Sequence, residues 1–416
     1  MFPGTTTGVP RKEQPVRKAG PATHAVPILF VFAVSSALLQ RCRQHFRRLL
    51  GGLAPSRGGA YARPVNDCEW MREALALARK GIGLTSPNPP VGAVLVKDGR
   101  EIGRGWHRGA GRPHAEVEAI QDAVCRHGPE APAGATIYVT LEPCSTRGRS
   151  GACTTAIMQA GIRRVVFGAI DPHPAHAGRA TGLLQAAGVK VLEGVEESAC
   201  EVLIRPFAKA QRCGLPWIIL KTAMSLDGRI TRPAGEGPWL SSAASRRDVQ
   251  KLRLEADAIL TSGQTVRNDD PRLTLRSLDV PDTKKQPWRI VLTSREDGVP
   301  PDARLRRDAW ADRTRIFHGR RIEQVLRELV AACEVSTVLV EAGGRLLGRL
   351  LDEEWADEMV VYLAPLVTGG EVPAVAGEGA ASLAERWRLD EVRFARIGAD
   401  VRLRGRFAGR GGPLER

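Results

Sequence analysis

The sequence lacks a hydrophobic run long enough to cross a membrane. The N-terminal apolar run, Ala25 to Leu39, has 15 residues, whereas a membrane-spanning helix needs roughly 20. The eight cysteines are scattered at positions 42, 68, 125, 144, 153, 200, 213 and 333. This distribution is unlike a disulfide framework and favours a reducing compartment. We therefore expect a cytoplasmic protein without stable membrane insertion.

Aromatic residues are also few, and the charge is unevenly distributed. Three Tyr and nine Phe in 416 residues offer few platforms for stacking nucleic-acid bases. The net charge is +15, but residues 1–66 hold ten Lys and Arg and one Glu, which leaves only +6 for residues 67–416. A mildly basic body suits phosphorylated small molecules and dinucleotides. We expect no nucleic-acid partner.

Three side chains that bind zinc occur close together in the sequence. His114 is followed by Glu116, 29 residues separate His114 from Cys144, and eight separate Cys144 from Cys153. One imidazole and two thiolates make a three-ligand zinc set that leaves a fourth position for water. Glu116 is suited to move protons to and from a water that the metal activates. The pattern is typical of zinc nucleobase deaminases, except that their two cysteines are closer together.

The predicted helices and strand around these residues support a metal site more strongly than the residue types alone. A lone histidine or buried cysteine is usually structural. Here the sequence predicts a helix from Ala115 to Arg126, a strand from Ala135 to Leu141, and a helix from Ser150 to Ala160 that carries Cys153 in its first turn. Two helix N-termini directed at one point favour thiolate and hydroxide. We therefore predict a metal site.

Residues 1–65 differ from the rest of the chain, being rich in Pro, Gly, Thr and Arg. They could form a membrane-proximal anchor, a targeting peptide or a disordered extension. Four arginines at 41, 43, 47 and 48 follow the apolar run, and no small-residue cleavage site is plain. We favour a disordered or targeting-like extension, outside the catalytic part of the protein.

Helices that alternate with strands predict a layered α/β domain over residues 66–210. The predicted helices are Cys68–Lys80, Ala115–Arg126, Ser150–Ala160, Arg179–Ala187 and Glu196–Ala210. The predicted strands are Val91–Val96, Glu101–Trp106, Ala135–Leu141, Arg163–Ile170 and Val189–Leu192. Gln211–Pro216 is interpreted as a linker.

A second α/β domain is predicted over residues 215–408. Its expected strands are Trp217–Ala223, Ala258–Ser262, Arg289–Thr293, Thr337–Glu341, Met359–Leu366 and the region Arg393–Phe407. Its expected helices are Ser241–Ala256, capped by Ser241 or Ser242, Arg321–Ala332 and Arg345–Leu351. Gly343 and Gly344 stand between a strand and a helix, where free backbone N–H groups can meet phosphate, although a simple tight turn is the commoner explanation.

Beyond these patterns, the chain from about Asp67 to Phe407 resembles the bifunctional deaminase–reductase family of riboflavin biosynthesis. The motifs in the first domain are Asn88-Pro89-Pro90-Val91-Gly92, His114 to Ala119, Thr140 to Ser145, Gly148-Arg149, Cys153, Asp171-Pro172-His173-Pro174 and Ala177-Gly178-Arg179. Those in the second are Ser225 to Arg229, Trp239, Arg246 to Gln250, Asp269 to Thr274 and Val340 to Gly344. The eight-residue cysteine gap is this family's own spacing.

The resemblance implies a cytidine-deaminase-like, three-layer α/β/α domain followed by a dihydrofolate-reductase-like α/β domain. The first would use zinc on His114, Cys144 and Cys153 to deaminate 2,5-diamino-6-(5-phosphoribosylamino)pyrimidin-4-one, with Glu116 as the catalytic proton carrier. The second would reduce the ribosyl side chain to ribityl with NADPH. It also implies a homo-oligomer, a dimer or a tetramer.

By position, the resemblance also implies contacts in the second domain. The cofactor-binding residues would be Ala223, Trp239, Thr265, Asp269, Gly343, Gly344, Arg345, Leu346, Leu347, Gly348 and Arg349. The substrate-binding residues would be Gly237, Arg253, Leu273, Arg276 and Glu341, the arginines being suited to phosphate. Two residues depart from the family pattern: Thr146 stands where many members have His, and Gly237 where Ser is common.

Two other functions are compatible with the metal motif. The chain could be a nucleoside or tRNA zinc deaminase with an accessory binding domain, or a zinc-stabilised scaffold without activity. The long cysteine gap and the large second domain disfavour the first of these. Glu116 disfavours the second, because a structural site has no use for a base beside an open metal position.

Overall fold

The computed structural model describes residues 66–146, 151–174, 176–230, 239–276, 280–281 and 284–408. The expected N-terminal extension 1–65 and Gly237 lie outside the described residues. Among the described residues, no helix is both long and apolar enough to span a bilayer.

The first domain is built on a five-stranded sheet with the order β2-β1-β3-β4-β5. Its strands are β1 (Gly92–Lys97), β2 (Arg100–Trp106), β3 (Thr136–Leu141), β4 (Arg164–Ala169) and β5 (Lys190–Leu192). β1 and β2 form an antiparallel hairpin, β1 also pairs antiparallel with β3, and β3, β4 and β5 run parallel. The parallel strands therefore end at one edge of the sheet, next to the loops that follow them.

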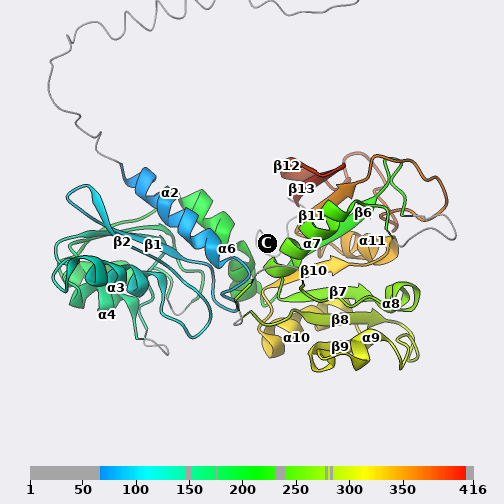
Figure 1. The fold of residues 1–416 in the computed structure, drawn as a ribbon, viewed down its shortest axis with the longest axis horizontal. Helices are drawn as coiled ribbons and strands as arrows, with labels where there is room; N and C mark the ends of the chain where they lie inside the picture. Colours follow the sequence, from blue (N-terminus) through cyan, green and yellow to red (C-terminus); the bar gives the residue numbers. More distant parts are fainter. Residues whose placement is uncertain are drawn as a thin grey trace, which may run out of the picture. The chain divides into compact units, whose positions relative to one another are not determined.

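Helices cover both faces of this sheet (Figure 1). The helices are α2 (Asp67–Ala78), α3 (Ala115–His127), α4 (Cys153–Gln159), α5 (Arg179–Ala186) and α6 (Glu197–Cys213). Side chains of β1 alternate between the faces: Ala93 and Leu95 pack with α3, α4 and α5, whereas Val94 and Val96 pack with α2 and α6. The predicted three-layer α/β/α domain is confirmed.

The second domain contains an eight-stranded sheet with the order β12-β13-β11-β6-β10-β7-β8-β9. Its strands are β6 (Trp217–Met224), β7 (Ala258–Ser262), β8 (Trp288–Thr293), β9 (Thr314–His318), β10 (Thr337–Glu341), β11 (Glu358–Leu363), β12 (Leu389–Ile397) and β13 (Asp400–Phe407). The six strands from β11 to β9 in this order run parallel, and β13 and β12 add an antiparallel hairpin.

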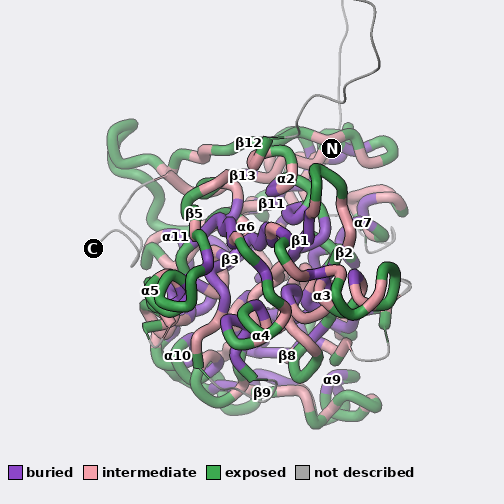
Figure 2. Tube along the Cα trace, turned by 90° about the vertical axis from the view of Figure 1, so that its left-hand side faces the viewer, coloured by how far each residue is buried: buried purple, intermediate pink, exposed green. Residues whose placement is uncertain are grey.

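Helices again cover both faces of the second sheet. They are α7 (Ala243–Glu255), α8 (Gly263–Asp269), α9 (Arg304–Arg307), α10 (Ile322–Cys333) and α11 (Gly344–Asp352). Val249 and Leu252 of α7 pack on one face, and α10 and α11 pack on the other. The central strands of both sheets are consequently buried, as Figure 2 shows for β1 and β3.

Several boundaries differ from those predicted. The interpretation of Gln211–Pro216 as a linker is wrong in its first half, because α6 continues to Cys213 and ends at Gly214 in a left-handed conformation. Ser242, rather than Ser241, caps α7 by accepting a hydrogen bond from the backbone N–H of Ser245. Strand β9 was not predicted, because a basic, polar segment with one buried residue, Phe317, has little of the apolar pattern of a strand.

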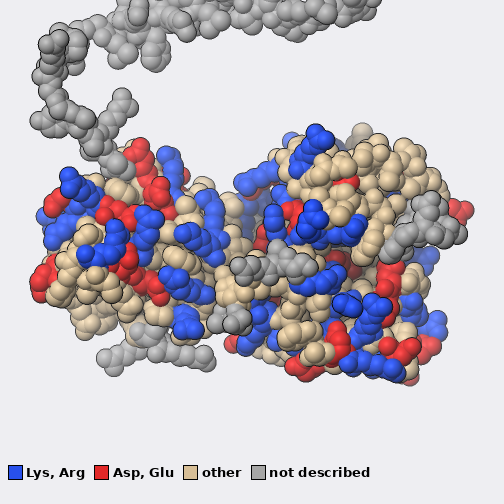
Figure 3. Space-filling model, in the orientation of Figure 1, with Lys and Arg blue, Asp and Glu red and all other residues tan. Residues whose placement is uncertain are grey.

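Charged side chains of both signs are mixed on the surface shown in Figure 3. Many are paired in the described residues, among them Arg72 with Glu196, Arg108 with Glu118, and Arg295 with Asp297. On this face of the described residues, the charges are interspersed rather than gathered into one basic stripe.

Candidate active sites

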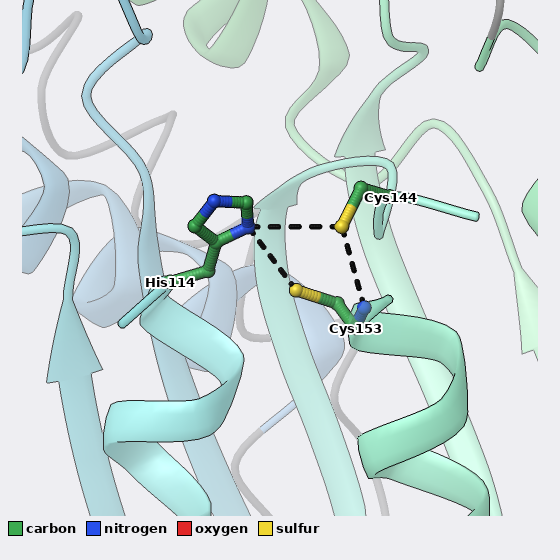
Figure 4. A group of neighbouring side chains, drawn as sticks. All are labelled: His114, Cys144 and Cys153. Carbon is green, nitrogen blue, oxygen red and sulfur yellow. Dashed lines mark hydrogen bonds between the residues drawn. The ribbon is translucent and has the colours of Figure 1, made fainter. Parts of the chain in front are cut away.

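The three predicted metal ligands come together between two helix starts (Figure 4). His114 is the residue that precedes the first turn of α3, and Cys153 is the first residue of α4. Cys144 lies in the loop after β3. The ends of three elements therefore place one imidazole and two sulfurs within 4.8 Å of one another.

The geometry of this group fits zinc. The Nδ1 atom of His114 lies 3.7 Å from Sγ of Cys144 and 3.3 Å from Sγ of Cys153. A tetrahedral zinc, with bonds of about 2.3 Å to sulfur and about 2.0 Å to nitrogen, separates such ligands by about 3.5 Å. Three protein ligands leave one position open, as in catalytic zinc sites. The donor set and its spacing thus fit the implied metal.

The surroundings of Cys144 favour its thiolate. Hydrogen bonds from the Cys153 side chain, from the His114 ring and from the Cys153 backbone N–H, which lies 3.3 Å from Sγ of Cys144, lower the pKa of the Cys144 thiol. Because the thiolate is the form that binds metal, this arrangement prepares the loop after β3 for zinc.

Glu116 lies in the first turn of α3, two residues after His114, and is 3% exposed. The pKa of its carboxyl group is raised to about 7, mainly by burial; His114 opposes this shift and the nearby Cys144 adds to it. A carboxyl group that is poised near neutrality can both accept and donate a proton. Its position beside the three ligands therefore suits the predicted proton transfer.

A cavity of about 250 Å³ opens onto the metal ligands. It is lined by Pro87, Asn88, Pro89, Val91, His107, His114, Glu116, Leu141, Glu142, Cys144, Asp171, His173, His176, Phe207 and Gln211. The Nδ1 atom of His107 lies 3.0 Å from the carbonyl oxygen of Pro113, and its Nε2 atom lies 3.0 Å from Nδ2 of Asn88. Because a carbonyl only accepts, His107 carries its proton on Nδ1 and accepts at Nε2 from Asn88. This chain of contacts fixes the orientation of the Asn88 amide at the cavity.

Glu142 holds another wall of the same cavity. Its buried carboxylate accepts hydrogen bonds from three backbone N–H groups, at 3.2 Å from Asp171, 2.9 Å from Gly178 and 2.9 Å from Ala180. This segment also carries His173 and His176, and Thr146 Oγ1 lies 3.4 Å from His176. Thr146, which differs from the family pattern, is therefore in contact with a residue of the cavity wall.

The second domain gathers polar residues where its parallel strands end. Glu341 is the last residue of β10, and its neighbour in register on β6 is Lys221. Arg253 of α7 forms a two-point ion pair with Glu341, with Nε–Oε1 at 2.6 Å and Nη2–Oε2 at 3.0 Å. Ligands of open α/β sheets bind at the carboxyl ends of the strands, so this cluster marks a candidate site.

The charges of this cluster depend on one another. Burial raises the pKa of Glu341, but Arg253, Lys221 and Arg276 together lower it below its ordinary value. Burial lowers the pKa of Lys221, whereas Glu341 raises it. The predicted role of Arg253 in binding phosphate meets a competing contact, because Nη1 of Arg253 also donates to the Thr274 carbonyl at 2.8 Å. Arg276 has no ion pair among the described residues.

The predicted cofactor residues lie around the same edge of the sheet. Ala223 is the second-last residue of strand β6, Thr265 is in α8 directly after β7, and Asp269 ends α8. Trp239 is 60% exposed, and the Arg246 guanidinium lies 5.4 Å from its ring centre. These residues sit on segments that follow neighbouring parallel strands.

The segment from Gly343 to Arg349 is divided between two environments. A side chain at Gly343 would meet nothing within 4 Å, whereas a Cβ at Gly348 would overlap the Ala376 carbonyl oxygen, 0.9 Å away. Leu346 and Leu347 belong to the hydrophobic core, and Arg349 pairs with Glu353. Gly343 has open space beside it and Arg345 is exposed, whereas Gly344 is buried against the Pro373 carbonyl. The role of each residue stays a prediction.

Sequence reasoning assigned no role to four residues that the structure brings to these sites. Asn88 and Glu142 stand in motifs that were recognised, but nothing in the motifs showed what they contact. His107 lies seven residues before His114 without a pattern of its own. Lys221 gave a usable signal, since it is a lysine that directly follows the apolar run Trp217–Leu220 within one strand.

Comparisons with known families agree with this division of the chain. Residues 64–169 match the cytidine and deoxycytidylate deaminase zinc-binding region. Residues 216–403 match the RibD C-terminal domain. The first match contains all three metal ligands and Glu116, and the second contains the cluster around Glu341.

Similar proteins cover nearly the whole described chain. The riboflavin biosynthesis protein RibD of Escherichia coli is 38% identical over 81% of this chain and 98% of its own length, and that of Aquifex aeolicus is 37% identical over 80% and 97%. The structure of Acinetobacter baumannii RibD, form 1, matches with a TM-score of 0.76 and 35% identity over 82% of this chain and 99% of that one. A diaminohydroxyphosphoribosylaminopyrimidine deaminase/5-amino-6-(5-phosphoribosylamino)uracil reductase from Thermotoga maritima matches with a TM-score of 0.70 and 30% identity over 82% and 99%. The chain therefore belongs to the RibD family, the bifunctional deaminase–reductases of riboflavin biosynthesis.

Proposed function

We propose that zinc on His114, Cys144 and Cys153 serves hydrolytic deamination of 2,5-diamino-6-(5-phosphoribosylamino)pyrimidin-4-one, and that NADPH then reduces the ribosyl side chain to ribityl. We assign the deaminase domain to residues 66–210 and the reductase domain to residues 215–408. The observation that carries the proposal is the buried Glu116 beside a three-ligand set with zinc spacing.

The deaminase residues have distinct tasks. Zinc, when bound, supplies a Lewis acid that lowers the pKa of water. Glu116 moves one proton from the attacking water to the ring nitrogen and a second from the new hydroxyl on the ring carbon to the departing amine, so that water is consumed, the C–N bond breaks and ammonia leaves. Asn88, oriented by His107, offers its amide to the pyrimidine. Glu142 holds the wall with His173 and His176 in place.

The reductase residues bind and orient. NADPH, when bound, supplies a hydride. The ribosyl group gains this hydride and a proton, which gives the ribityl product and NADP⁺. Lys221, held beside Glu341, is the group suited to deliver the proton, because burial makes its ammonium easier to deprotonate. The predicted contacts of Ala223, Trp239, Thr265, Asp269 and the segment 343–349 would hold the cofactor, and Leu273, Arg276 and Glu341 the substrate.

The test is incubation of the purified full chain with the aminopyrimidine phosphate and NADPH, with ammonia release and NADPH oxidation followed separately. We expect one equivalent of each, with ammonia preceding oxidation. Ammonia without oxidation would remove the cofactor assignment, and oxidation without ammonia would remove the deaminase assignment. NADH in place of NADPH tests the choice of cofactor.

The alternative of a nucleoside or tRNA deaminase is not favoured, because the second match is to a reductase domain. A cytoplasmic location and a dimeric or tetrameric state stay predictions.

A further inference from the structure

The loop that follows α8 adopts an unfavourable backbone conformation. Asp270 and Leu273 have φ angles of 38° and 49°, in the left-handed region that non-glycine residues rarely adopt. Leu273 is buried. Strained residues of this kind persist only where the surrounding contacts fix them.

Side chains from outside the loop provide those contacts. The Gln286 amide makes a two-point hydrogen bond with Leu275, accepting from its N–H at 2.7 Å and donating to its carbonyl at 2.9 Å. The Gln250 side chain accepts from the backbone N–H of Arg276 at 2.9 Å. Arg289, which is 1% exposed, donates to the Arg272 carbonyl at 3.1 Å. The backbone of Arg272, Leu275 and Arg276 is thus held by side chains from outside the loop.

The residue at the end of this held loop is Arg276. Its guanidinium contacts Thr274 Oγ1 at 3.3 Å, and no carboxylate among the described residues forms an ion pair with it. Burial and the neighbouring cations Arg253 and Arg272 lower its pKa. Arg253, in contrast, already satisfies Glu341. The Arg276 guanidinium is therefore available to bind an anion.

We propose that Gln286, together with Gln250, is a positioning residue of the reductase site, which holds the strained loop so that Arg276 meets the substrate's phosphate. Gln286 does not touch the substrate; it acts through the backbone of Leu275 and Arg276. This inference rests on the proposed reductase function and adds to it a residue outside the predicted binding set.

The primary experiment is Gln286→Ala in the full-length enzyme. Loss of two backbone hydrogen bonds should raise the KM for the deaminated pyrimidine phosphate about tenfold, with NADPH affinity and the rate of ammonia release unchanged. Gln324→Ala, an exposed glutamine on α10, is the matched control and should behave as wild type. Gln286→Glu keeps the acceptor for Leu275 N–H and loses the donor, so it should be intermediate.

A double-mutant cycle separates positioning from a general structural role. In an Arg276→Ala background, Gln286→Ala should change KM by less than about twofold, because the group that it positions is gone. A substrate without its phosphate should also be reduced equally by wild type and Gln286→Ala. Independent, additive effects or an equal loss on the dephosphorylated substrate would overturn the proposal. If Gln286→Ala does not fold, as judged by circular dichroism and lost NADPH binding, Gln286→Glu supplies the same cycle.

The proposed function and the role of Gln286 can be refuted separately. If the wild-type enzyme oxidises no NADPH with the substrate, the proposed function fails. If wild type does so and Gln286→Ala matches it in KM, only the role of Gln286 fails.

Discussion

The two sites of this chain are built in contrasting ways. The deaminase site draws its metal ligands and its base from His114 to Cys153, at the starts of α3 and α4 and in one loop. The proposed reductase site draws on Lys221, Arg253, Arg276 and Glu341, which lie on β6, α7, a loop and β10. A compact motif fixes the first site, whereas the topology of a parallel sheet assembles the second.

This contrast predicts how each site should respond to the substitution of one of its residues. In the first, the proposed reaction should depend on both the metal and Glu116, because neither has a substitute at the site. In the second, ion pairs and backbone contacts share substrate binding among several groups, so loss of one binding group should be partial. The predictions below test the contrast in order of expected effect.

Glu116→Gln should reduce ammonia release between about 100- and 10,000-fold, because the amide cannot carry the proton. Zinc content and NADPH oxidation with supplied deaminated substrate should be unchanged. The measurements are metal analysis and ammonia assay on the same preparation. Full deaminase activity in this variant would refute the role of Glu116.

Lys221→Met should slow the reductase step about 100- to 1,000-fold, as expected for loss of one preorganised charged donor. Ammonia release should be as in wild type. Lys251→Met, an exposed lysine on α7, is the control. An equal loss of both activities would contradict the separation of the two sites.

Glu142→Gln should raise the KM for deamination about tenfold. The amide keeps one acceptor oxygen, so part of the contact with the backbone of Asp171, Gly178 and Ala180 is lost, and hydrogen bonds to a charged group are the stronger ones. Zinc content should not change. Glu130→Gln, at an exposed glutamate, is the control, and an unchanged KM for Glu142→Gln would show that the loop needs no such support.

Asp67→Asn should have the smallest effect and should act on stability alone. The Asp67 carboxylate accepts from Arg164 at 2.8 and 2.7 Å and from the Tyr138 hydroxyl at 2.8 Å, and the Arg164 contact lowers its pKa from 3.8. Because the folded pKa is depressed, this stabilisation is present above the unfolded pKa and is lost as pH falls through the folded value.

The variant should therefore lose about 0.5–1 kcal/mol at neutral pH and less at acidic pH. Urea unfolding at about pH 7 and about pH 3 measures the difference. The same deficit at both values would mean that the ion pair is not its source.

The sequence allowed most of the deaminase site to be predicted and much less of the reductase site. His114, Cys144, Cys153 and Glu116 could be identified because metal chemistry restricts residue types and because α3 and α4 have clear patterns. The pairing of Arg253 with Glu341 could not, since 88 residues separate them and only the parallel sheet brings them together. The contact of Gln286 with Leu275 was equally hidden, because one side-chain amide in a loop has no pattern.

The distance between α3 and the sheet depends on two glycines of β2, which have no side chain. A Cβ at Gly103 would lie 2.3 Å from the Ala119 carbonyl oxygen, and one at Gly105 would lie 2.5 Å from the Ala115 carbonyl oxygen. The backbone of α3 can therefore pack directly against the backbone of β2, and this places Glu116 closer to the sheet. The two glycines of β2 thus set how closely α3 packs on the sheet and, through α3, the position of Glu116.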